Sequence, residues 1–578
     1  MNKNFTLLIG GIQGEGVVST GISLMKALSR RGYYTLSERK FSSRIKGGNT
    51  HVAITIAKKE EVNSVESCYD MIMAMDQDSI HLNMHQLKPK GILLYDEDIK
   101  IDEEWTDGLR SIALPLSAIA KKHGKLFMKN TSVIGCLGKV TGFTYEVLQE
   151  MVTEAYGNKG EEVLDQNIAV LKTAFNHAST TISRASFFDS EPAQAKKKMM
   201  MIGNEAIAIG AVVAGCRFMA GYPITPASDV MENLALIFPL VGGKTVQTED
   251  EVAAIAMTIG ASHAGVRSMT ATSGPGMTLM GEGLGLAGMT ETPIVVVDAQ
   301  RAGPSTGMPT KMEQSDLSFL YHGGHGEYAA IILSPSTLQE CYEMTVDAFN
   351  LADRYQCPVI IMTDLNLSLS AKTIDEISFS EPVIDRGQLA STEILESSYD
   401  GGFTRYQLTE NGISARAIPG TKGGQHQVTG LEHNELGRPS DHPENRKAMM
   451  DKRMKKTDPL KEREGIILEG KASGSTLFLT FGSLYGTLKE AWMRTGKNVD
   501  LARIGRIKPL PVKQLETLMD QYEKIIVVEC NYHGQLANII NQETGQPQKV
   551  KSITRYDGKG FSIEEMMEIM DRWCQEWK

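Results

Sequence analysis

Closely spaced cysteines are absent from this sequence. The seven cysteines lie at least 16 residues apart, and no C-x-x-C motif occurs. Iron–sulfur clusters and structural zinc sites are usually bound by cysteines at short spacings. The sequence therefore argues against either kind of site within this chain, and it favours reduced, mostly buried thiols.

Long apolar runs and an excess of basic residues are also missing. The best apolar stretch, 206–222, is interrupted by Arg217, and the apolar run at the N-terminus is too short for a signal peptide. A cytoplasmic protein without a membrane contact is therefore expected. The net charge of −10 gives no means of releasing counterions from a phosphate backbone, so nucleic-acid binding is not expected.

Aromatic residues make up only 6% of the chain, whereas glycine occurs 55 times, which suits tight βα turns better than an all-β fold. Alternating strand-like and helix-like segments predict a multi-domain α/β protein. The predicted parts are an α/β domain at 1–185, a polar linker at 186–200, a second α/β domain at 201–370, an irregular connecting segment at 371–470 and a last α/β domain at 471–578. Strands are predicted at 4–9, 33–38, 51–56, 70–74, 92–95, 216–222, 268–272, 293–299, 358–364, 476–482 and 524–530.

The N-terminal segment LLIGGIQGEGVVSTG (7–21) is typical of a strand, a glycine turn and a helix in a βαβ unit. Such turns bind dinucleotide pyrophosphates, and Glu38 at the end of the next predicted strand suits a ribose. The fingerprint is imperfect, because Ser19 stands where the third glycine belongs. The alternative is a tight turn that packs the helix on the strand and binds no cofactor.

Four segments of the second α/β domain combine glycine, proline, hydroxyl groups and a few charges. They are GYPITPASD (221–229), VQTEDEVAAIAMTIGASHAG (246–265), TATSGPGMTLMGEG (270–283) and DAQRAGPSTGMPTKMEQSD (298–316). Open α/β sheets bind ligands in loops at the carboxyl ends of their strands. Arg301 in the last segment suits a small carboxylate, which a guanidinium holds through two hydrogen bonds. The alternative for Arg301 is a solvated loop cation or a surface ion pair.

Two further features have an ordinary structural interpretation beside a functional one. Thr248 with Glu251 three residues later forms a capping-box pattern, so Glu251 alone is better read as a helix cap. His322 and His325 stand three residues apart with no third ligand nearby, which favours loop structure or a cofactor contact over a metal site.

Longer motifs together resemble a known family, the 2-oxoacid:ferredoxin oxidoreductases. Its α subunit is resembled by GNEAIAIGAVVAG (203–215), YPITPASD (222–229), TEDEVAAIAMTIGASHAGVRSMTATSGPG (248–276), QRAGPSTGMPTKMEQSDL (300–317), YHGGHGEY (321–328), RYQLTENGISARAIPG (405–420), GLEHNELG (430–437), FGSLYGTLKEA (481–491) and VVECNYHGQLANI (527–539). Its γ domain, fused here in front, is resembled by GGIQGEGVVSTG (10–21) and SSRIKGGNTHVAI (42–54). The resemblance covers nearly the whole chain. It implies a γ-type α/β domain, a pyrimidine-binding-like domain over 201–370 and a transketolase C-terminal-like domain over 471–578.

The resemblance implies a reaction and a set of partners. These enzymes use thiamine diphosphate to cleave a 2-oxoacid, release CO2, reduce ferredoxin through iron–sulfur clusters and form an acyl-CoA, or run the reverse reductive carboxylation. The family's diphosphate-binding domain carries a G-D-G motif, which this sequence lacks along with clustered cysteines. Mg²⁺ and a [4Fe-4S] cluster are therefore expected on a separate β subunit that shares the thiamine diphosphate, in a dimer of αγ–β heterodimers. 2-Oxoglutarate is favoured over pyruvate as substrate, because the fused γ–α layout is typical of that branch.

The resemblance also implies roles for residues at matching positions. Glu251, with Glu249 as the runner-up, would activate the cofactor from a dry site where its carboxyl can hold a proton. Thr225, Arg301 and Thr310 would line the substrate site, with Arg301 on the substrate carboxylate. The residues expected to contact the cofactor are Tyr222, Pro223, Ile224, Glu251, Gly274 and Gly276. No metal ligand is expected in this chain.

Other interpretations stay open from the sequence. The lysines of 447–461 are read as a solvated helix face, with docking of an acidic ferredoxin or a CoA phosphate as the alternative. The family's γ domain is not a nicotinamide site, which favours a packing role for the N-terminal glycine turn. Alternative functions are an NAD(P)-binding oxidoreductase built on residues 10–38 and a non-catalytic assembly subunit.

Overall fold

The computed structural model describes residues 4–41, 48–101, 110–192, 196–378, 383–396, 402–470 and 475–575. The chain forms two compact units, which are described separately. The first contains residues 1–201 together with 370–377, and the second contains 202–369 and 378–578. Part of the γ-like motif at 42–54 lies outside the described residues, because 42–47 are not among them.

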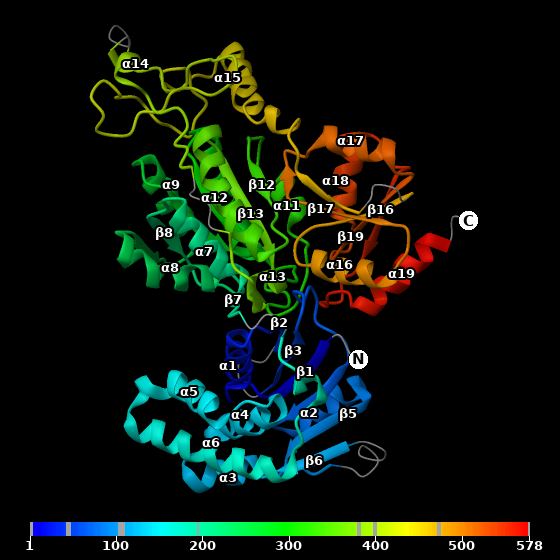
Figure 1. Cartoon of the computed structure of the whole chain (residues 1–578). Coiled ribbons are helices and arrows are strands. Elements are labelled where there is room, and N and C mark those ends of the chain that lie inside the picture. The colour runs from blue at the N-terminus through cyan, green and yellow to red at the C-terminus, as the bar shows by residue number, and fades with distance from the viewer. Residues whose placement is uncertain are drawn as a thin grey trace. The chain divides into compact units, whose positions relative to one another are not determined.

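In the described part of the first unit, eight strands form one mixed sheet in the order β6-β5-β4-β1-β3-β2-β14-β7 (Figure 1). The elements are β1 Asn4–Ile12, α1 Val17–Arg30, β2 Tyr34–Phe41, β3 Asn49–Ala57, β4 Tyr69–Ala74, α2 Gln77–Asn83, β5 Leu87–Asp96, β6 Arg110–Leu114, α3 Leu116–His123, α4 Lys129–Thr141, α5 Tyr145–Tyr156, α6 Glu161–Thr181, β7 Met199–Met201 and β14 Lys372–Ile374. Apolar residues of the central strands β1, β3 and β4 form the core of this sheet.

The glycine turn of the first unit does not build a dinucleotide site. β1 pairs with β4 in parallel and with β3 in antiparallel orientation, and β3 lies between β1 and β2. Glu38 on β2 is therefore separated from the β1–α1 turn by a whole strand, whereas a ribose-binding acid has to follow the adjacent parallel strand. The predicted strand–helix–strand opening is confirmed, with β1 parallel to β2, but β3 lies between the two strands, so the dinucleotide interpretation of the turn is not supported.

The edge of the first sheet is completed by a segment from far along the chain. β14 pairs with β2 on one side and with β7 on the other, both in antiparallel orientation. The Ser37 amide donates to the Ala371 carbonyl at 2.8 Å, and the Tyr34 hydroxyl donates to Asp375 at 2.8 Å. Lys198, from the segment predicted as a linker, is buried and pairs with the Asp375 carboxylate.

The second unit contains two α/β sheets. In its described residues the larger sheet has the order β18-β12-β13-β11-β10-β8-β9, parallel except for β18. The elements of this part are α7 Gly203–Val213, β8 Phe218–Gly221, α8 Ser228–Val241, β9 Lys244–Gln247, α9 Glu251–His263, β10 Ser268–Thr272, α10 Gly274–Met289, β11 Ile294–Gln300, α11 Leu317–His322, β12 Ile331–Leu333, α12 Leu338–Tyr355, β13 Pro358–Asp364, α13 Leu365–Leu369, α14 Thr392–Glu396 and α15 Pro443–Lys455. Right-handed crossovers place α8 and α12 on one face of the sheet and α9 and α10 on the other.

The strand order of the larger sheet reverses beside β8. The chain steps from β8 to β9 at one side and then crosses to β10 at the other side of β8. The chain therefore leaves β8 and β10 in opposite directions, and ligands of open α/β sheets bind at such reversal points.

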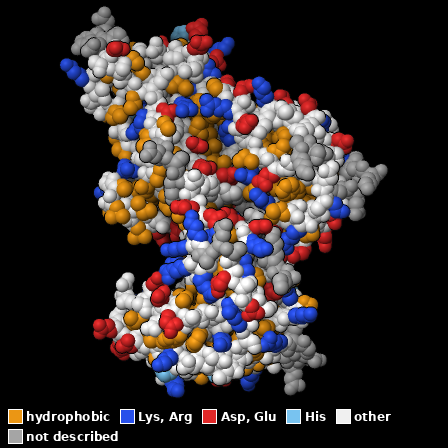
Figure 2. Space-filling view, in the orientation of Figure 1, with side chains coloured by type: hydrophobic (Ala, Val, Ile, Leu, Met, Phe, Trp, Pro, Cys, Tyr) orange, Lys and Arg blue, Asp and Glu red, His pale blue; other side chains and the backbone are white. Residues whose placement is uncertain are grey.

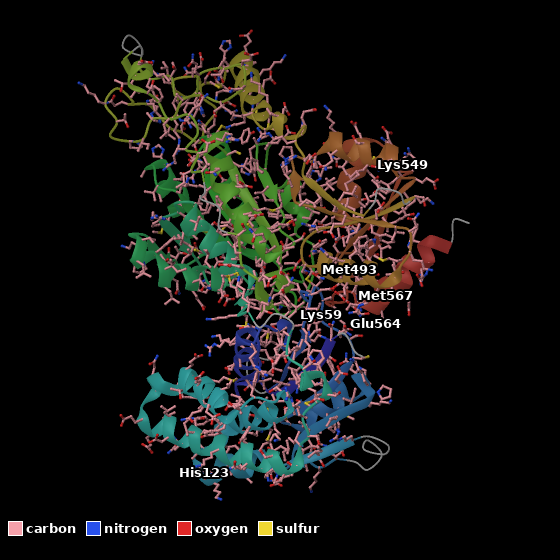
Figure 3. The ribbon with its side chains drawn as sticks, in the orientation of Figure 1. Lys59, His123, Met493, Lys549, Glu564 and Met567 are labelled. Atoms are coloured by element: carbon pink, nitrogen blue, oxygen red, sulfur yellow. The ribbon has the colours of Figure 1, made fainter. Side chains whose placement is uncertain are left out.

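The smaller sheet of the second unit has the order β15-β17-β16-β19-β20 in the described residues. Its elements, with β18 of the larger sheet, are β15 Ile466–Glu469, β16 Thr476–Thr480, α16 Leu484–Thr495, β17 Asp500–Ile504, β18 Arg506–Lys508, α17 Val512–Gln521, β19 Lys524–Glu529, α18 Gln535–Thr544, β20 Val550–Thr554 and α19 Ile563–Gln575. α16 and α19 pack against each other, and Figure 3 labels one methionine on each, Met493 and Met567. Gln314 ties the two sheets together, because its side chain donates to the Asp364 carboxylate and to the Phe481 carbonyl.

Cations at the edge of the larger sheet where its parallel strands begin bind the ends of its helices. α7, α9, α10 and α12 all end at this edge, where unpaired carbonyls give each helix a partial negative charge. Arg267, Arg386, Arg405 and Lys456 donate to the carbonyls of Ala214, Gly265, Glu291 and Gln356 respectively. Three of these cations come from the irregular segment, which explains why a stretch poor in secondary structure packs on this domain.

The lysines of 447–461 are not a uniformly solvated face. Lys452 and Lys456 are fully buried, and their ammonium groups lie 2.6 Å and 3.0 Å from the carboxylate of Glu291. The run was predicted to be a solvated helix face, with a docking surface as the alternative. Both interpretations are wrong for Lys452 and Lys456, because these lysines neutralise the buried carboxylate of Glu291 at the end of α10.

Most of the predicted strands are confirmed, including those that carry the functional loops. The runs predicted at 216–222, 268–272, 293–299 and 358–364 coincide with β8, β10, β11 and β13 to within a few residues at their ends. In the part of the chain that the structure describes, no helix combines the length and the apolarity needed to cross a membrane.

Candidate active site

The loops that follow β8, β9, β10 and β11 meet at the carboxyl edge of the larger sheet. Thr225 and Arg301 lie in the loops after β8 and β11, and Glu251 and Gly274 begin the helices that follow β9 and β10, so one edge of one domain collects the residues singled out from the sequence. The reversal of strand order lies between β8 and β10, so the first and third of these segments flank it.

The loop after β8 is held from two sides. Arg301 donates from Nη1 to the Thr225 carbonyl at 2.7 Å, and Asn204 at the start of α7 donates to the Pro226 carbonyl at 2.7 Å. Tyr222, Pro223 and Thr225 are exposed, and Ile224 is half-buried. The backbone of this loop is fixed, while its side chains, including the Thr225 hydroxyl, are accessible from outside.

Glu251 is the first residue of α9 and is only 6% exposed. The helix is capped by Asp250, whose side chain accepts the Ala253 amide at 2.7 Å, while the Thr248 hydroxyl donates to the Asp250 carbonyl. The predicted capping box is therefore wrong: the helix starts two residues later than a Thr248 cap requires, and Glu251 is free of a capping role. Glu249, two residues earlier, is exposed.

Gly276 in the first turn of α10 explains how Glu251 is buried. A Cβ at this position would lie 2.7 Å from Glu251 Oε1 and 2.0 Å from the Thr272 hydroxyl oxygen. Any larger side chain would push against the carboxyl, so glycine lets the turn close over Glu251 Oε1.

Arg301 is buried at the root of the loop after β11. Its exposed fraction is 7%, and its Nε has no hydrogen-bond partner among the described residues. Burial lowers the pKa of Arg301, and the nearby Asp316 opposes this shift. The guanidinium is therefore anchored through Nη1 but retains donor capacity for an acceptor that the described chain does not supply.

Two aspartates lie behind Arg301. Asp298 on β11 is completely buried, and both of its carboxylate oxygens lack a hydrogen-bond partner among the described residues. Burial, and then Asp316, raise the pKa of Asp298 well above its ordinary value. Burial also raises the pKa of Asp316 to about 7; Glu313 adds to this rise, whereas Arg301 and the Gly274 amide oppose it.

The remaining residues predicted from the sequence lie in different surroundings. Thr310 is half-buried in the turn just after the hairpin that the Ala302–Met308 bridge closes. A Cβ on Gly274 would lie 2.6 Å from Asp316 Oδ1, so this glycine contacts the acidic pair. His325 is exposed beside Glu282, 3.6 Å away, which fits the loop interpretation.

Sequence reasoning missed Asn204, Asp298 and Asp316. Asp298 and Asp316 stand in the quoted segment 298–316, and Asp298 interrupts the apolar run VVVDA, which is an unusual place for a charge in a buried parallel strand. That interruption is the signal that would have found it. Asn204 carries no comparable signal, because its role depends on how α7 meets a loop 22 residues later.

Comparison with family models agrees with this layout. Residues 209–452 match "Pyruvate flavodoxin/ferredoxin oxidoreductase, thiamine diP-bdg". Residues 6–177 match "Pyruvate ferredoxin/flavodoxin oxidoreductase", and residues 475–566 match "Pyruvate:ferredoxin oxidoreductase core domain II".

Individual relatives cover between 64% and all of this chain. The 2-oxoacid:ferredoxin oxidoreductase subunit alpha of a Sulfolobus species is 32% identical, with 97% of this chain and 96% of that protein covered. The 2-oxoglutarate synthase subunit KorA of Methanothermobacter thermautotrophicus is 35% identical over 64% of this chain and 96% of its own length. The solved 2-oxoglutarate:ferredoxin oxidoreductase from Magnetococcus marinus, with 2-oxoglutarate, coenzyme A and succinyl-CoA bound, has a TM-score of 0.91 and 35% identity, and all of both chains is covered. The chain therefore belongs to the 2-oxoacid:ferredoxin oxidoreductases, as an alpha-type subunit that carries the gamma-like domain at its N-terminal side.

Proposed function

We propose that the 2-oxoacid used by this subunit is 2-oxoglutarate. The observation that carries the proposal is the likeness over the full chain to a solved oxidoreductase with 2-oxoglutarate bound. The relatives named 2-oxoglutarate synthase, which cover 64% of this chain, support the same substrate.

A substrate panel tests this choice. The chain, co-expressed with its β subunit, is assayed with 2-oxoglutarate and pyruvate in the presence of CoA and a viologen dye. We expect kcat/KM to be higher for 2-oxoglutarate. A site that binds the second carboxylate of this substrate leaves its polar groups unpaired when pyruvate, which lacks that carboxylate, is bound. Equal or higher kcat/KM for pyruvate would contradict the proposal.

Within the site, we assign the substrate carboxylate to Arg301 and the walls around it to Thr225 and Thr310. Arg301 is buried, fixed through one nitrogen to the Thr225 carbonyl and left with a free donor on Nε. A planar guanidinium held in this way can bind a carboxylate through two parallel hydrogen bonds. The Thr225 hydroxyl stands on the exposed side of the same loop.

Arg301→Lys is expected to raise KM for the 2-oxoacid about 10- to 100-fold, because one charge-assisted hydrogen bond of about 1.5–3 kcal/mol is lost. Initial rates of the complete enzyme over a range of 2-oxoacid concentrations provide the measurement. Arg446→Lys is the matched control, since Arg446 forms an exposed ion pair with Glu432. An unchanged KM in Arg301→Lys would remove Arg301 from the carboxylate site.

The residues around Glu251 fit the thiamine diphosphate that the family model assigns to this domain. When bound, this cofactor supplies the carbon nucleophile that attacks the keto group and stabilises the resulting charge. Glu251 would hold a proton on its carboxyl toward the cofactor's pyrimidine ring, from a buried position that a Cβ on Gly276 would otherwise fill. Tyr222, Pro223 and Ile224 offer an accessible, largely apolar wall, and Gly274 and Gly276 allow close approach of α10. Mg²⁺ and a [4Fe-4S] cluster are assigned to the β subunit.

Exposed apolar helix faces support a partner that covers the site. Hydrophobic side chains gather over α8, where Leu236 is 75% and Leu240 is 83% exposed (Figure 2). On α9 and α10 the exposed apolar side chains are Val252, Met257, Leu279 and Leu286. Large exposed apolar patches mark protein interfaces. We assign the α9–α10 face, which begins at Glu251, to the β subunit, within a dimer of αγ–β heterodimers.

The chain purified without a β subunit is expected to show no 2-oxoacid-dependent reduction of a viologen dye. The physical reason is that the sequence has neither the G-D-G motif for a diphosphate-bound metal nor cysteines spaced for a cluster. Addition of the separately purified β subunit should restore the activity. Reduction by the isolated chain would show that the catalytic site is complete within it.

A further inference from the structure

Gln314, a completely buried residue of the loop that also carries Arg301, joins the ends of three strands. Its side-chain nitrogen donates to the Asp364 carboxylate at 3.0 Å, where β13 ends, and to the Phe481 carbonyl at 3.1 Å, just after β16. Its side-chain oxygen accepts the Cys530 amide at 3.1 Å, just after β19. β13 belongs to the larger sheet, and β16 and β19 belong to the smaller one. One side-chain amide therefore uses both its nitrogen and its oxygen to connect the two sheets.

The surroundings of this side chain fit an amide and not a second carboxylate. Besides Gln314, Asp364 accepts the backbone amides of Leu367 at 3.0 Å and Ser483 at 2.8 Å, and no cation pairs with it among the described residues. Gly482, with a φ of +63°, lets the loop after β16 approach closely, since a Cβ there would lie 2.8 Å from Gln314 Nε2. An ionised carboxyl group at position 314 would meet the Asp364 carboxylate with no hydrogen to donate.

The backbone around Gln314 is held by the domain of the smaller sheet as well. The Gln314 amide donates to the Cys530 carbonyl at 2.6 Å, and the Asn531 side chain donates to the Gln314 carbonyl at 3.2 Å. The Gln535 side chain, at the start of α18, donates to the Ser315 carbonyl at 2.9 Å. Because all three partners lie between the end of β19 and the start of α18, one short segment of this domain fixes the end of the loop.

The end of the loop that is fixed in this way reaches Arg301 through two hydrogen bonds. The backbone amides of residues 302 and 303 donate to the Lys311 carbonyl at 3.0 Å and to the Glu313 carboxylate at 3.1 Å respectively. Residues 302 and 303 directly follow Arg301, and Glu313 directly precedes Gln314. The backbone of Arg301 is therefore held by the same segment that Gln314 anchors, so a shift at Gln314 moves the guanidinium as well.

We propose that Gln314 positions Arg301 for the substrate carboxylate, and that the domain of the smaller sheet serves the reaction by holding Gln314. The inference rests on the proposed role of Arg301 as the carboxylate site. Two parallel hydrogen bonds form only when the guanidinium and the carboxylate are aligned, so the backbone that carries Arg301 has to stay in place. A displacement of about 1 Å in such a site can cost about 100-fold in rate. Gln314 is a positioning residue, because it acts through Arg301.

The test measures KM and kcat of the complete enzyme, with its β subunit, for the wild type and Gln314→Glu. We expect KM for the 2-oxoacid to rise about tenfold, because the new carboxylate repels Asp364 and the loop has to shift. We expect kcat to change by less than about threefold, since Asp250 caps the helix that begins with Glu251 without help from this loop. Gln546→Glu adds the same charge at an exposed site of the same domain and should leave both parameters within about twofold.

A double-mutant cycle distinguishes positioning from a merely structural role. Combining Gln314→Glu with Arg301→Lys should raise KM by clearly less than the product of the two single effects, because the fork that has to be aligned is already gone. A KM equal to that product would mean that Gln314 acts independently of Arg301, and it would overturn the inference. An unchanged KM in Arg301→Lys contradicts the carboxylate role of Arg301 itself. A raised KM there, with an unchanged KM in Gln314→Glu, contradicts only the positioning role.

Gln535→Leu keeps the test decisive if Gln314→Glu does not assemble with the β subunit. Gln535 is half-buried, and this change removes its hydrogen bonds to the Ser315 carbonyl and the Ser318 amide without adding a buried charge. We expect KM to rise about threefold, and again by less than the product when the change is combined with Arg301→Lys. In that case an unchanged KM in Gln535→Leu would overturn the inference.

Discussion

Glu251→Gln is expected to lower kcat of the complete enzyme about 10²- to 10⁴-fold, the range that a positioned acid or base contributes. Glutamine preserves the size of the side chain that lies against Gly276 but cannot exchange a proton at Oε1. Because Asp250 caps α9 through its own carboxylate, the helix start does not depend on Glu251. The variant should therefore assemble with the β subunit and unfold near the wild-type temperature, so that the loss is confined to turnover.

Glu249→Gln is the matched control for this experiment. Glu249 stands two residues earlier in the same loop, is exposed and is the runner-up for the same role. We expect its kcat to stay within a few-fold of the wild type, as is usual for exposed substitutions. Near-normal turnover in Glu251→Gln would refute the role of Glu251, and a severe loss in Glu249→Gln instead would transfer the role to that residue. Unchanged activity in both variants would favour the non-catalytic assembly interpretation.

Glu291→Gln is expected to destabilise the second unit by about 3–5 kcal/mol, the usual cost of removing one partner of a buried ion pair. Glu291 is fully buried, and its two carboxylate oxygens accept hydrogen bonds from Lys452 and Lys456. Burial alone would raise the pKa of Glu291, but the two lysines outweigh it and hold the pKa well below its ordinary value. Without that charge, two buried ammonium groups have no carboxylate opposite them.

Chemical denaturation of the purified chain provides the measurement for Glu291→Gln. Glu282→Gln on the exposed face of α10 is the control, and it should change the free energy of unfolding by less than about 0.5 kcal/mol. Lys452→Met should cost less than Glu291→Gln, because Glu291 keeps Lys456. The stabilisation should be fully present above the ordinary glutamate pKa of about 4.3 and should be lost as the pH falls below it, since the folded pKa is depressed. Equal stability of Glu291→Gln and the wild type would show that the cluster does not hold the segment.

The functional edge of the larger sheet could be predicted from the sequence because its signals are local. Buried parallel strands appear as short β-branched runs such as PIVVVDA, and the glycine and proline residues after them mark the loops. Since parallel strands bring their carboxyl ends to one edge, the motifs after the predicted strands were enough to place Thr225, Glu251 and Arg301 at the same edge of the sheet.

The remaining features depend on contacts between distant segments. The cation cluster at the helix ends joins Glu291 to lysines more than a hundred residues later, and a charged run gives no sign of which lysines are buried. The capping-box pattern at Thr248 competed with an equally good cap at Asp250, and only the backbone shows which one starts the helix. The dinucleotide interpretation of the first unit failed because β3, which comes later in the sequence, lies between the parallel strands β1 and β2.

Strand β14 has a consequence for the synthesis of this protein. Among the described strands, β7 joins the first sheet only through β14, and β2 pairs with no other strand on that side. Residues 202–369 have to be translated in between, which takes on the order of ten seconds or more at typical elongation rates. During that interval the nascent chain presents an unpaired strand edge beside the ribosome, of the kind that recruits other chains. A fragment that stops at residue 201 would keep this edge permanently, so the N-terminal domain should be produced with residues 370–377 supplied, by fusion or by expression of the whole chain.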